Sequence, residues 1–250
     1  MPLSPPRAAA PSAIRIAKVA KRYSRLQVLD GLDLEVGRGE FFGLVGVNGV
    51  GKTTCIKGLL DFTNIDAGSV EIFGVPHRET RARRHLAFLP ERFLPPYYLS
   101  GRDFLDYMGR LHGRPCGEDE RLEMCARLDL DAAALAKPVR DYSKGMAQKL
   151  GLAACFLSGK ELLVLDEPMS GLDPKARILV KRHLRSCRSR GHSVFISTHM
   201  LSDVEELCDR MGILHAGKLR FVGSPEECRR TYFCDTLEEA YLNCISQPAS

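Results

Sequence analysis

Three short, continuous apolar runs predict strands that are buried on both faces. They lie in "FFGLV" (Phe41–Val45), "ELLVLDEP" (Glu161–Pro168) and "GHSVFISTHM" (Gly191–Met200). Strands of a parallel sheet are covered by helices on both sides, so their sequences read as continuous apolar runs. A helical pattern follows the first run, from Thr53 to Leu60. This succession predicts an α/β core.

Other stretches predict different elements. Within residues 14–36, "IRIAKV" and "LDLEV" alternate apolar and polar residues, as antiparallel strands with one solvated face do. Residues 211–223 read as a hairpin that turns at Ala216-Gly217. Between about residues 95 and 158 helical patterns dominate and β-branched residues are scarce, so we expect a helical region there.

The segment "DYSKGMAQKLGLAACF" (residues 141–156) carries an apolar stripe at helical spacing. Ser143 is a favourable N-cap, and Gly145 leaves the first turn open to close approach. Because helix N-termini attract anions, this end of the helix is a candidate anion contact. The stripe consists of Met146, Leu150, Ala153, Ala154 and Leu157.

Length and composition are those of an ordinary globular protein. A chain of 250 residues can bury a full core as one large or two small domains. No uncharged run approaches the roughly 20 residues that span a bilayer, and the Pro/Ala-rich start lacks the apolar region of a signal peptide. We therefore expect a cytoplasmic protein with a disordered tail over residues 1–12. The nine cysteines include no C-x-x-C pair, which fits free thiols in a reducing compartment better than disulfides or a zinc site.

The formal net charge is only +5, yet basic residues gather in "HRETRARRH" (residues 77–85) and in residues 175–190. In the second cluster the arginines lie off an apolar helical stripe. That cluster is either a solvated helix face or a surface for nucleic acid or anionic lipid, and charge alone does not decide. The stripe consists of Ala176, Val180, Leu184 and Cys187.

The most informative stretch follows the first apolar run. It reads G-V-N-G-V-G-K-T and matches the phosphate-loop pattern G-x-x-x-x-G-K-[ST]. Its glycines let backbone N–H groups surround phosphate oxygens, Lys52 reaches the β- and γ-phosphates, and the Thr53 hydroxyl binds Mg²⁺. The flanking strand and helix argue against a chance match, so the sequence predicts a nucleoside-triphosphate site. Its residues are Gly46, Val47, Asn48, Gly49, Val50, Gly51, Lys52, Thr53 and Thr54.

Two acids end the second apolar run. Asp166 and Glu167 follow "LLVL" directly, and ligands of open α/β sheets bind beyond the carboxyl ends of the strands. Asp166 suits the Mg²⁺ shell, and Glu167 can orient the attacking water. The same rule applies to His199 after the third run. A lone histidine there is either structural or faces the γ-phosphate, and its place at a strand end favours the phosphate.

Together these motifs resemble the nucleotide-binding subunit of ATP-binding cassette (ABC) transporters over about residues 14–223. Six elements occur in the order of that family. They are Tyr23, the phosphate loop, "LAFLPE" ending at Glu91, "YSKGM" at residues 142–146, the acidic pair with Glu167, and "SGLD" followed by "STH". The resemblance implies an α/β phosphate-loop NTPase core with an antiparallel β subdomain and a helical signature subdomain. It also implies that Tyr23 stacks on adenine, so that the nucleotide is ATP.

The resemblance also implies which anion the segment at residues 141–156 contacts. In this family the signature, usually Leu-Ser-Gly-Gly-Gln, contacts the γ-phosphate of ATP that is held by a second subunit. Ser143 and Gly145 keep the phosphate-binding positions, and Asp173, itself a predicted helix N-cap before Pro174, belongs to the same set of contacts across the dimer. The residues that depart from the family pattern are Tyr142, Lys144 and Met146.

Two further departures lie near the phosphates. Val47 and Val50 replace the usual Pro and Ala of the loop; backbone amides bind there, so we expect little effect. Glu91 stands where the family has Gln. A carboxylate near Mg²⁺ either binds the metal directly or carries a raised pKa, and the sequence leaves both open.

The resulting hypothesis is an ATPase subunit that uses ATP and Mg²⁺ to drive transport, with export favoured. We expect it to pair with a second copy or a related cassette, and to sit at the inner face of the cell membrane through an integral-membrane partner. Direct nucleic-acid binding is not expected. The expected divisions are a tail at 1–12, a nucleotide-binding domain at 13–232 with its helical part at about 95–158, and a C-terminal extension at 233–250.

Two other functions would also use a phosphate loop. A non-transport ABC ATPase, for example in cofactor assembly, remains an alternative. Repair types carry a long coiled coil that is missing from the sequence, and translation types usually carry two cassettes per chain. A phosphate-loop kinase would leave the signature and His199 without a role.

Overall fold

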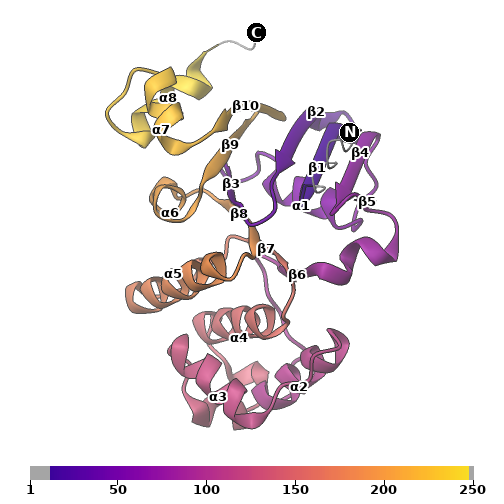
Figure 1. Ribbon diagram of the computed structural model, residues 1–250, viewed down its shortest axis with the longest axis vertical. Helices are drawn as coiled ribbons and strands as arrows, with labels where there is room; N and C mark the ends of the chain where they lie inside the picture. The colour runs from indigo at the N-terminus through magenta and orange to yellow at the C-terminus, as the bar shows by residue number, and fades with distance from the viewer. Residues whose placement is uncertain (1–11, 248–250) are drawn as a thin grey trace, which may run out of the picture.

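The structure is a computed structural model that describes residues 12–247. A six-stranded sheet lies at its centre, with the strand order β10-β9-β3-β8-β7-β6 (Figure 1). All pairings in this sheet are parallel except that of β10 with β9. The strands are β3 (Phe41–Val45), β6 (Leu86–Leu89), β7 (Leu162–Asp166), β8 (Ser193–Thr198), β9 (Arg210–His215) and β10 (Lys218–Gly223).

The three apolar runs form β3, β7 and β8, and every residue of these strands is buried. The predicted α/β core is therefore confirmed. The helix after β3 is α1 (Lys52–Leu59), which begins and ends one residue earlier than expected. The hairpin is also confirmed, since Ala216 and Gly217 join β9 to β10 and both have positive φ.

A second, four-stranded sheet has the order β2-β1-β4-β5 and is antiparallel throughout. Alternate residues of β1, such as Ile14 and Ile16, are buried against Ile56 and Leu59 of α1. The alternating pattern thus predicted these strands correctly. The strands are β1 (Ile14–Tyr23), β2 (Leu26–Val36), β4 (Ala67–Ile72) and β5 (Val75–Pro76).

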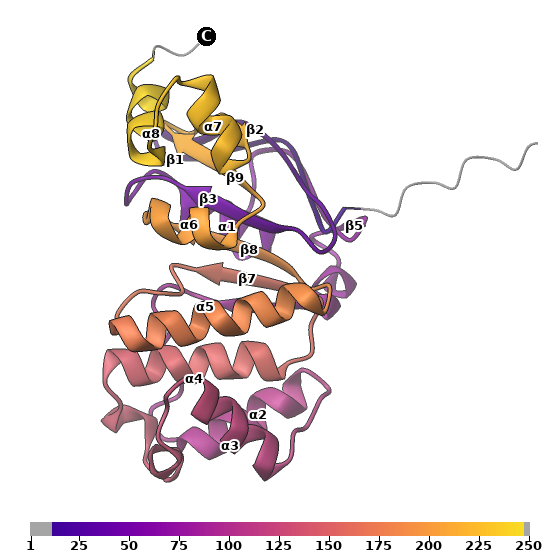
Figure 2. The same ribbon diagram turned by 60° about the vertical axis from the view of Figure 1, so that its left-hand side comes forward.

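A helical lobe occupies the stretch between β6 and β7 and lies in the lower part of Figure 1. Its helix α4 packs against α2, α3 and β6, and Figure 2 shows α4 beside α5. The elements of the lobe are α2 (Gly101–Leu111), α3 (Glu118–Arg127), α4 (Lys144–Leu157) and two short 3-10 helices, Ala132–Ala136 and Val139–Asp141. A third 3-10 helix, Thr80–His85, lies before β6 and contains most residues of the first basic cluster.

Helix α4 begins as the sequence predicts but is buried more extensively. The Met146 N–H donates to Ser143 Oγ at 3.2 Å, which confirms the N-cap. Gln148 and Lys149 are buried as well, although both lie outside the apolar stripe. The Gln148 amide donates to the Pro168 carbonyl, and the Lys149 ammonium donates to the Asp129 carbonyl at 2.8 Å. Distant carbonyl groups therefore allow two polar residues to be buried.

The last third of the chain completes the sheet and covers its β9–β10 end. Helix α5 (Pro174–Ser189) buries the expected stripe and also His183. Beyond β10, α7 (Pro225–Thr231) and α8 (Leu237–Ser246) pack against each other, at the opposite end of the molecule from α2 and α3 (Figure 1). Helix α6 (Leu201–Leu207) connects β8 to β9.

Some expectations are not tested by this architecture. The tail over residues 1–12 lies outside the described residues except for its last position, and the domain limits stay predictions. Within residues 12–247 no helix combines the length and apolar character needed to cross a membrane.

Candidate functional site

The phosphate loop joins the carboxyl end of β3 to α1, and its shape requires glycine at two positions. Gly49 has φ of 81°, a conformation that side chains disfavour. A Cβ atom on Gly46 would lie 2.6 Å from the Leu214 carbonyl oxygen of β9. The sequence therefore bends the backbone tightly here, and the N-terminus of α1 opens toward the loop.

Lys52 is buried at the start of α1 with 5% of its surface exposed. Its Nζ donates to the Gly46 carbonyl at 2.7 Å and to the Val47 carbonyl at 3.3 Å. It also lies 3.3 Å from Glu167 Oε1. A buried ammonium needs such partners, and they hold its charge at the loop where a phosphate group would bind.

Asp166 ends β7 and accepts two side-chain hydrogen bonds. Thr53 Oγ1 donates to its Oδ2 at 2.9 Å, and Ser197 Oγ donates to its Oδ1. Burial raises the pKa of Asp166; the hydrogen bonds from Ser197 and Thr53 oppose that rise, and the charges of Glu91 and Glu167 add to it. Negative charge is thus concentrated where a cation would relieve it.

The donor chemistry at this point fits Mg²⁺. The ion prefers oxygen ligands and keeps several water or phosphate oxygens in its shell. Thr53 and Asp166 supply a hydroxyl and a carboxylate in direct contact. In the part of the chain described here, no group of three or more His, Cys, Asp or Glu side chains could hold a metal ion by itself. Phosphate and water oxygens would therefore complete the shell.

Glu167 follows β7 in a conformation that is unusual for a non-glycine residue, with φ of 48°. Its N–H donates to the Ser197 carbonyl at 3.1 Å, which ties the turn to β8. Its Oε2 lies 2.9 Å from His199 Nδ1. The carboxylate is buried and the imidazole is about half exposed. The pair can accept a proton from water and stabilise the resulting charge.

One cavity of about 230 Å³ lies at this site. Its lining brings together residues from β3–α1, from the end of β6 and from the end of β7. It is formed by Asn48, Gly49, Gly51, Lys52, Thr53, Thr54, Glu91 and Glu167. The structure thus brings most of the predicted phosphate loop together with Glu91 and with Glu167, which lies more than 100 residues beyond the loop in the chain.

The predicted residues outside this lining include four that belong neither to the phosphate loop nor to the acids and histidine described above. They are Tyr23, Ser143, Gly145 and Asp173. Tyr23 ends β1, is 45% exposed and lies 3.3 Å from Thr63 through its hydroxyl. Because the residue is partly exposed, adenine could reach its ring. Stacking on adenine stays a prediction.

Ser143 and Gly145 lie beside the "SGLD" loop of the same chain. A Cβ atom on Gly145 would lie 2.9 Å from the Gly171 carbonyl, and Lys144 Nζ donates to Ser170 Oγ at 3.1 Å. Asp173 in turn caps α5 by accepting from the Ala176 N–H at 2.9 Å, which confirms that cap. Ser143 and Asp173 are exposed, so the two segments form one solvent-facing surface.

One functional residue was missed by sequence reasoning. Ser197 accepts the Glu167 N–H through its hydroxyl at 3.2 Å and donates to Asp166. It therefore positions both acids. The available signal was its place at the carboxyl end of β8, two residues before His199.

Comparison with known proteins supports the same interpretation. Residues 29–170 match the model of the family described as "ABC transporter". The chain belongs to the ABC transporter family. It is similar to an uncharacterised ABC transporter ATP-binding protein of Synechocystis, with 38% identity over 208 residues, 81% of this chain and 58% of that protein. The cassette thus spans less than two thirds of that relative.

Two other relatives of this ABC cassette have names that state a function. A Nod factor export ATP-binding protein I of Ralstonia nicotianae is 35% identical, covering 90% of this chain and 71% of that protein. A daunorubicin resistance ATP-binding protein of Streptomyces coeruleorubidus is 37% identical, covering 88% and 71%.

The fold of the cassette is confirmed by a solved ATP-binding subunit of an ABC transporter. The two superimpose with a TM-score of 0.85 at 27% identity, covering 93% of this chain and 99% of that chain. A dimeric ATP-binding cassette bound to ADP and Pi has the same fold, with a TM-score of 0.77 at 18% identity, covering 84% and 98%.

Proposed function

We propose that this ABC cassette binds and hydrolyses Mg-ATP to drive export through an integral-membrane partner. The observation that carries the proposal is the single cavity shared by the phosphate loop, the buried Lys52 and the Glu167 carboxylate. The names of two relatives, which refer to export and to drug resistance, favour the export direction.

The residues divide the chemistry between them. Loop N–H groups and Lys52 would bind the phosphates, while Thr53 and Asp166 would hold Mg²⁺, which neutralises charge on the phosphate oxygens. Glu167 would orient the attacking water and accept its proton. His199, 2.9 Å from the Glu167 carboxylate, would stabilise that group and face the γ-phosphate.

The cassette would act as a pair, formed with a second copy or a related chain. The signature and the "SGLD" loop form one exposed surface, and Ser143 and Asp173 lie outside the phosphate cavity of their own chain. The N-terminus of α4 is accessible to solvent, and a helix N-terminus of this kind can bind an anion. The support for pairing is therefore that each chain has a phosphate loop and, separately, an exposed helix N-terminus that suits a phosphate.

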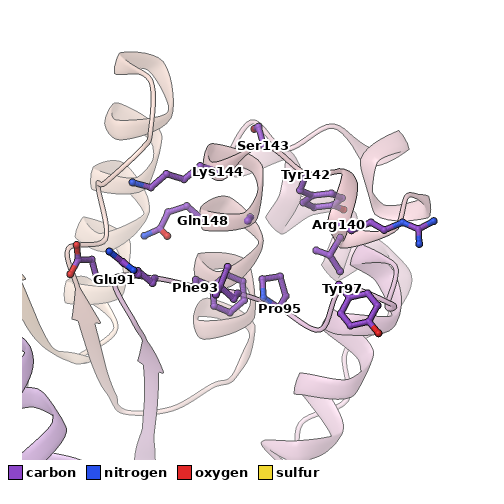
Figure 3. A pocket seen from close by; sticks show the side chains of 13 residues that line it. Glu91, Phe93, Pro95, Tyr97, Arg140, Tyr142, Ser143, Lys144 and Gln148 are labelled. Carbon is purple, nitrogen blue, oxygen red and sulfur yellow. The ribbon is translucent and has the colours of Figure 1, made fainter.

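A membrane partner would act on the site through Glu91. A larger cavity of about 540 Å³ lies between α4 and the segment that leads from β6 to α2. Figure 3 shows Glu91 at one end of it and Tyr97 and Arg140 at the other. Glu91 also lines the phosphate cavity, so a group that enters the larger cavity can influence the nucleotide. This partner would hold the cassette at the inner face of the membrane.

The test compares Lys52→Ala with Lys218→Ala, which removes an exposed lysine from β10. Saturating Mg-ATP should raise the melting temperature of the wild-type protein and of Lys218→Ala, because a ligand stabilises the state that binds it. Lys52→Ala should lose that shift and also phosphate release. An equal shift in Lys52→Ala would contradict the proposed site.

A further inference from the structure

A cavity of about 280 Å³ lies between the helical lobe and the core, at the other edge of the sheet from the phosphate loop. It is bordered by α3, by the carboxyl ends of α4 and α5, and by the residues that lead into β7 and β8. The phosphate loop, in contrast, follows the carboxyl end of β3, which is parallel to β8. We call this second site the α3–α5 cavity. Its lining includes Arg114, Arg127, Phe156, His183, Arg190 and His192.

A buried histidine forms part of the cavity wall. His183 is 6% exposed and packs on Phe156 with ring centroids 4.3 Å apart. In the part of the chain that the structure describes, its Nε2 is buried and has no hydrogen-bond partner. A buried polar atom without a partner costs free energy, and a neutral imidazole can carry its proton on Nε2. A ligand that accepts a hydrogen bond from Nε2 would therefore remove that cost.

The charged side chains of the cavity leave an excess of positive charge. Its lining holds three arginines and two glutamates, which gives one net positive charge if the two histidines are neutral. Arg114 and Arg127 each pair with one of these glutamates, which both belong to α3. Among the described residues Arg190 forms no ion pair with an acid; it donates to Ser186 Oγ at 3.4 Å and to Cys187 Sγ at 3.2 Å. One guanidinium is therefore available for an anion.

The electrostatic potential at His183 has the same sign. Burial is the main cause of the lowered pKa of His183, and the charges that add to it, those of Arg190, Arg127 and His192, are all positive. His192 is held at the rim of the cavity by its Nδ1, which lies 2.9 Å from the Lys160 carbonyl oxygen. A negative charge beside His183 would thus be stabilised by its surroundings.

We infer that the α3–α5 cavity binds a small aromatic carboxylate, whose carboxylate group accepts from Arg190 and from His183 Nε2. A guanidinium matches a planar carboxylate with two parallel N–H donors. A single negative charge balances the excess charge of the lining, and the apolar side chains of Met124, Phe156 and Leu157 suit an aromatic ring. The volume is slightly below the range of drug-sized sites, which limits the ligand to a small molecule. This site is separate from the ATP site and does not depend on it.

The experiment uses benzoate and benzamide, which share their ring and shape although only benzoate is charged. Each is titrated into the protein labelled with ¹³C on its methionine methyl groups, because Met124 lines the cavity. The Met124 resonance is assigned from Met124→Leu. Benzoate should shift it with a dissociation constant of roughly 1 mM or below, a scale suited to so small a ligand. Benzamide should bind roughly tenfold more weakly, because hydrogen bonds to a charged group are stronger.

Two variants test the two donors separately. Arg190→Gln should weaken benzoate binding roughly tenfold or more, the scale of a charge-assisted hydrogen bond, and should leave benzamide binding nearly unchanged. His183→Phe keeps an aromatic ring beside Phe156 but removes Nε2, and should weaken benzoate binding roughly two- to tenfold. The control is Arg185→Gln, on the same helix, whose side chain pairs with Glu206 of α6; it should bind benzoate as the wild type does. Melting temperatures establish that each variant is folded, and the exposed Arg190 tests the site even if His183→Phe does not fold.

Three results would overturn the inference. The first is a Met124 resonance that does not move at benzoate concentrations up to roughly 10 mM, well above the expected dissociation constant. The second is equal binding of benzoate and benzamide, which would show that the cavity does not select an anion. The third is unchanged benzoate binding in Arg190→Gln, which would place the carboxylate elsewhere.

Discussion

The Glu167 carboxylate lies between two groups that can carry positive charge. Lys52 Nζ is 3.3 Å from one oxygen and His199 Nδ1 is 2.9 Å from the other. The residue also keeps a φ of 48°, which costs on the order of 1 kcal/mol or more for a non-glycine residue. Strain of this kind persists where the surroundings fix a side chain, and here they fix it at the cavity.

Replacing Glu167 with Gln should therefore separate binding from hydrolysis. The amide keeps the size of the side chain but cannot accept a proton from water. Phosphate release should fall by about two decades or more, the usual scale for losing a general base, while ATP affinity is retained. Glu161→Gln, at the other end of β7, is the control. Turnover of Glu167→Gln within a few-fold of wild type would remove Glu167 from this role.

His183 provides a residue-scale prediction about stability. It is 6% exposed and packs on Phe156 with ring centroids 4.3 Å apart. Burial, and to a smaller extent the positive charges of Arg190, Arg127 and His192, lower the pKa of His183 to about 4. The native state therefore keeps this imidazole neutral at pH values at which the unfolded chain already binds a proton.

The sign of the pH effect follows from that difference. The unfolded imidazole titrates near pH 6.5, whereas the native one stays neutral down to about pH 4. The free energy of unfolding is therefore fully retained above pH 6.5 and decreases as the pH falls toward 4, because only the unfolded chain binds the proton. The loss at pH 5 should be about 1 to 2 kcal/mol. Melting temperatures at pH 5 and pH 7.5 should differ less for His183→Leu than for wild type. Equal differences would show that folding does not lower the pKa of His183.

At the scale of elements, the sequence predicted the strands and caps but not their polar contacts. The apolar runs gave β3, β7 and β8 because a doubly covered strand leaves a local signal. The burial of Lys149 leaves no such signal, because its partner, the Asp129 carbonyl, belongs to another segment. Ser197 was missed for the same reason, since a serine in an apolar strand acquires a role only when β7 lies beside it.

The segment between β6 and α2 is the element on which coupling should depend. Glu91, at its start, lines both the phosphate cavity and the larger cavity beside α4. Its charge also contributes to the raised pKa of Asp166. A change at this position should therefore alter how the larger cavity affects the nucleotide.

Glu91→Gln tests this with the residue that the family usually carries. The ratio of hydrolysis with the membrane subunit to hydrolysis without it should fall, by roughly two- to 30-fold for a coupling residue. Glu123→Gln, an exposed acid on α3 that pairs with Arg127, should keep the wild-type ratio. Equal ratios for Glu91→Gln and wild type would count against any coupling role.

At the scale of the whole molecule, the proposed site is divided between two separate parts of each chain. The phosphate loop, Glu91 and Glu167 line one cavity, whereas Ser143 and the "SGLD" loop share another, exposed surface. If two chains face each other in opposite orientations, each signature meets the other chain's ATP. Ser143→Arg should then block hydrolysis by crowding the partner's γ-phosphate, and Lys52→Ala should block ATP binding at its own loop.

Mixing these two inactive proteins should restore activity. In a mixed dimer both defects meet in one site, and the other site combines an intact phosphate loop with an intact signature. Phosphate release should therefore recover partially, up to about a quarter of the wild-type rate for random pairing if one site can turn over alone, since half of the dimers are mixed and each holds one intact site. ATP-dependent dimerisation of the mixture should be measured alongside, because it detects assembly even if one site cannot hydrolyse ATP without the other. A site formed within one chain gives no recovery at any mixing ratio. A mixture that exchanges subunits yet neither dimerises with ATP nor hydrolyses it would contradict the shared site.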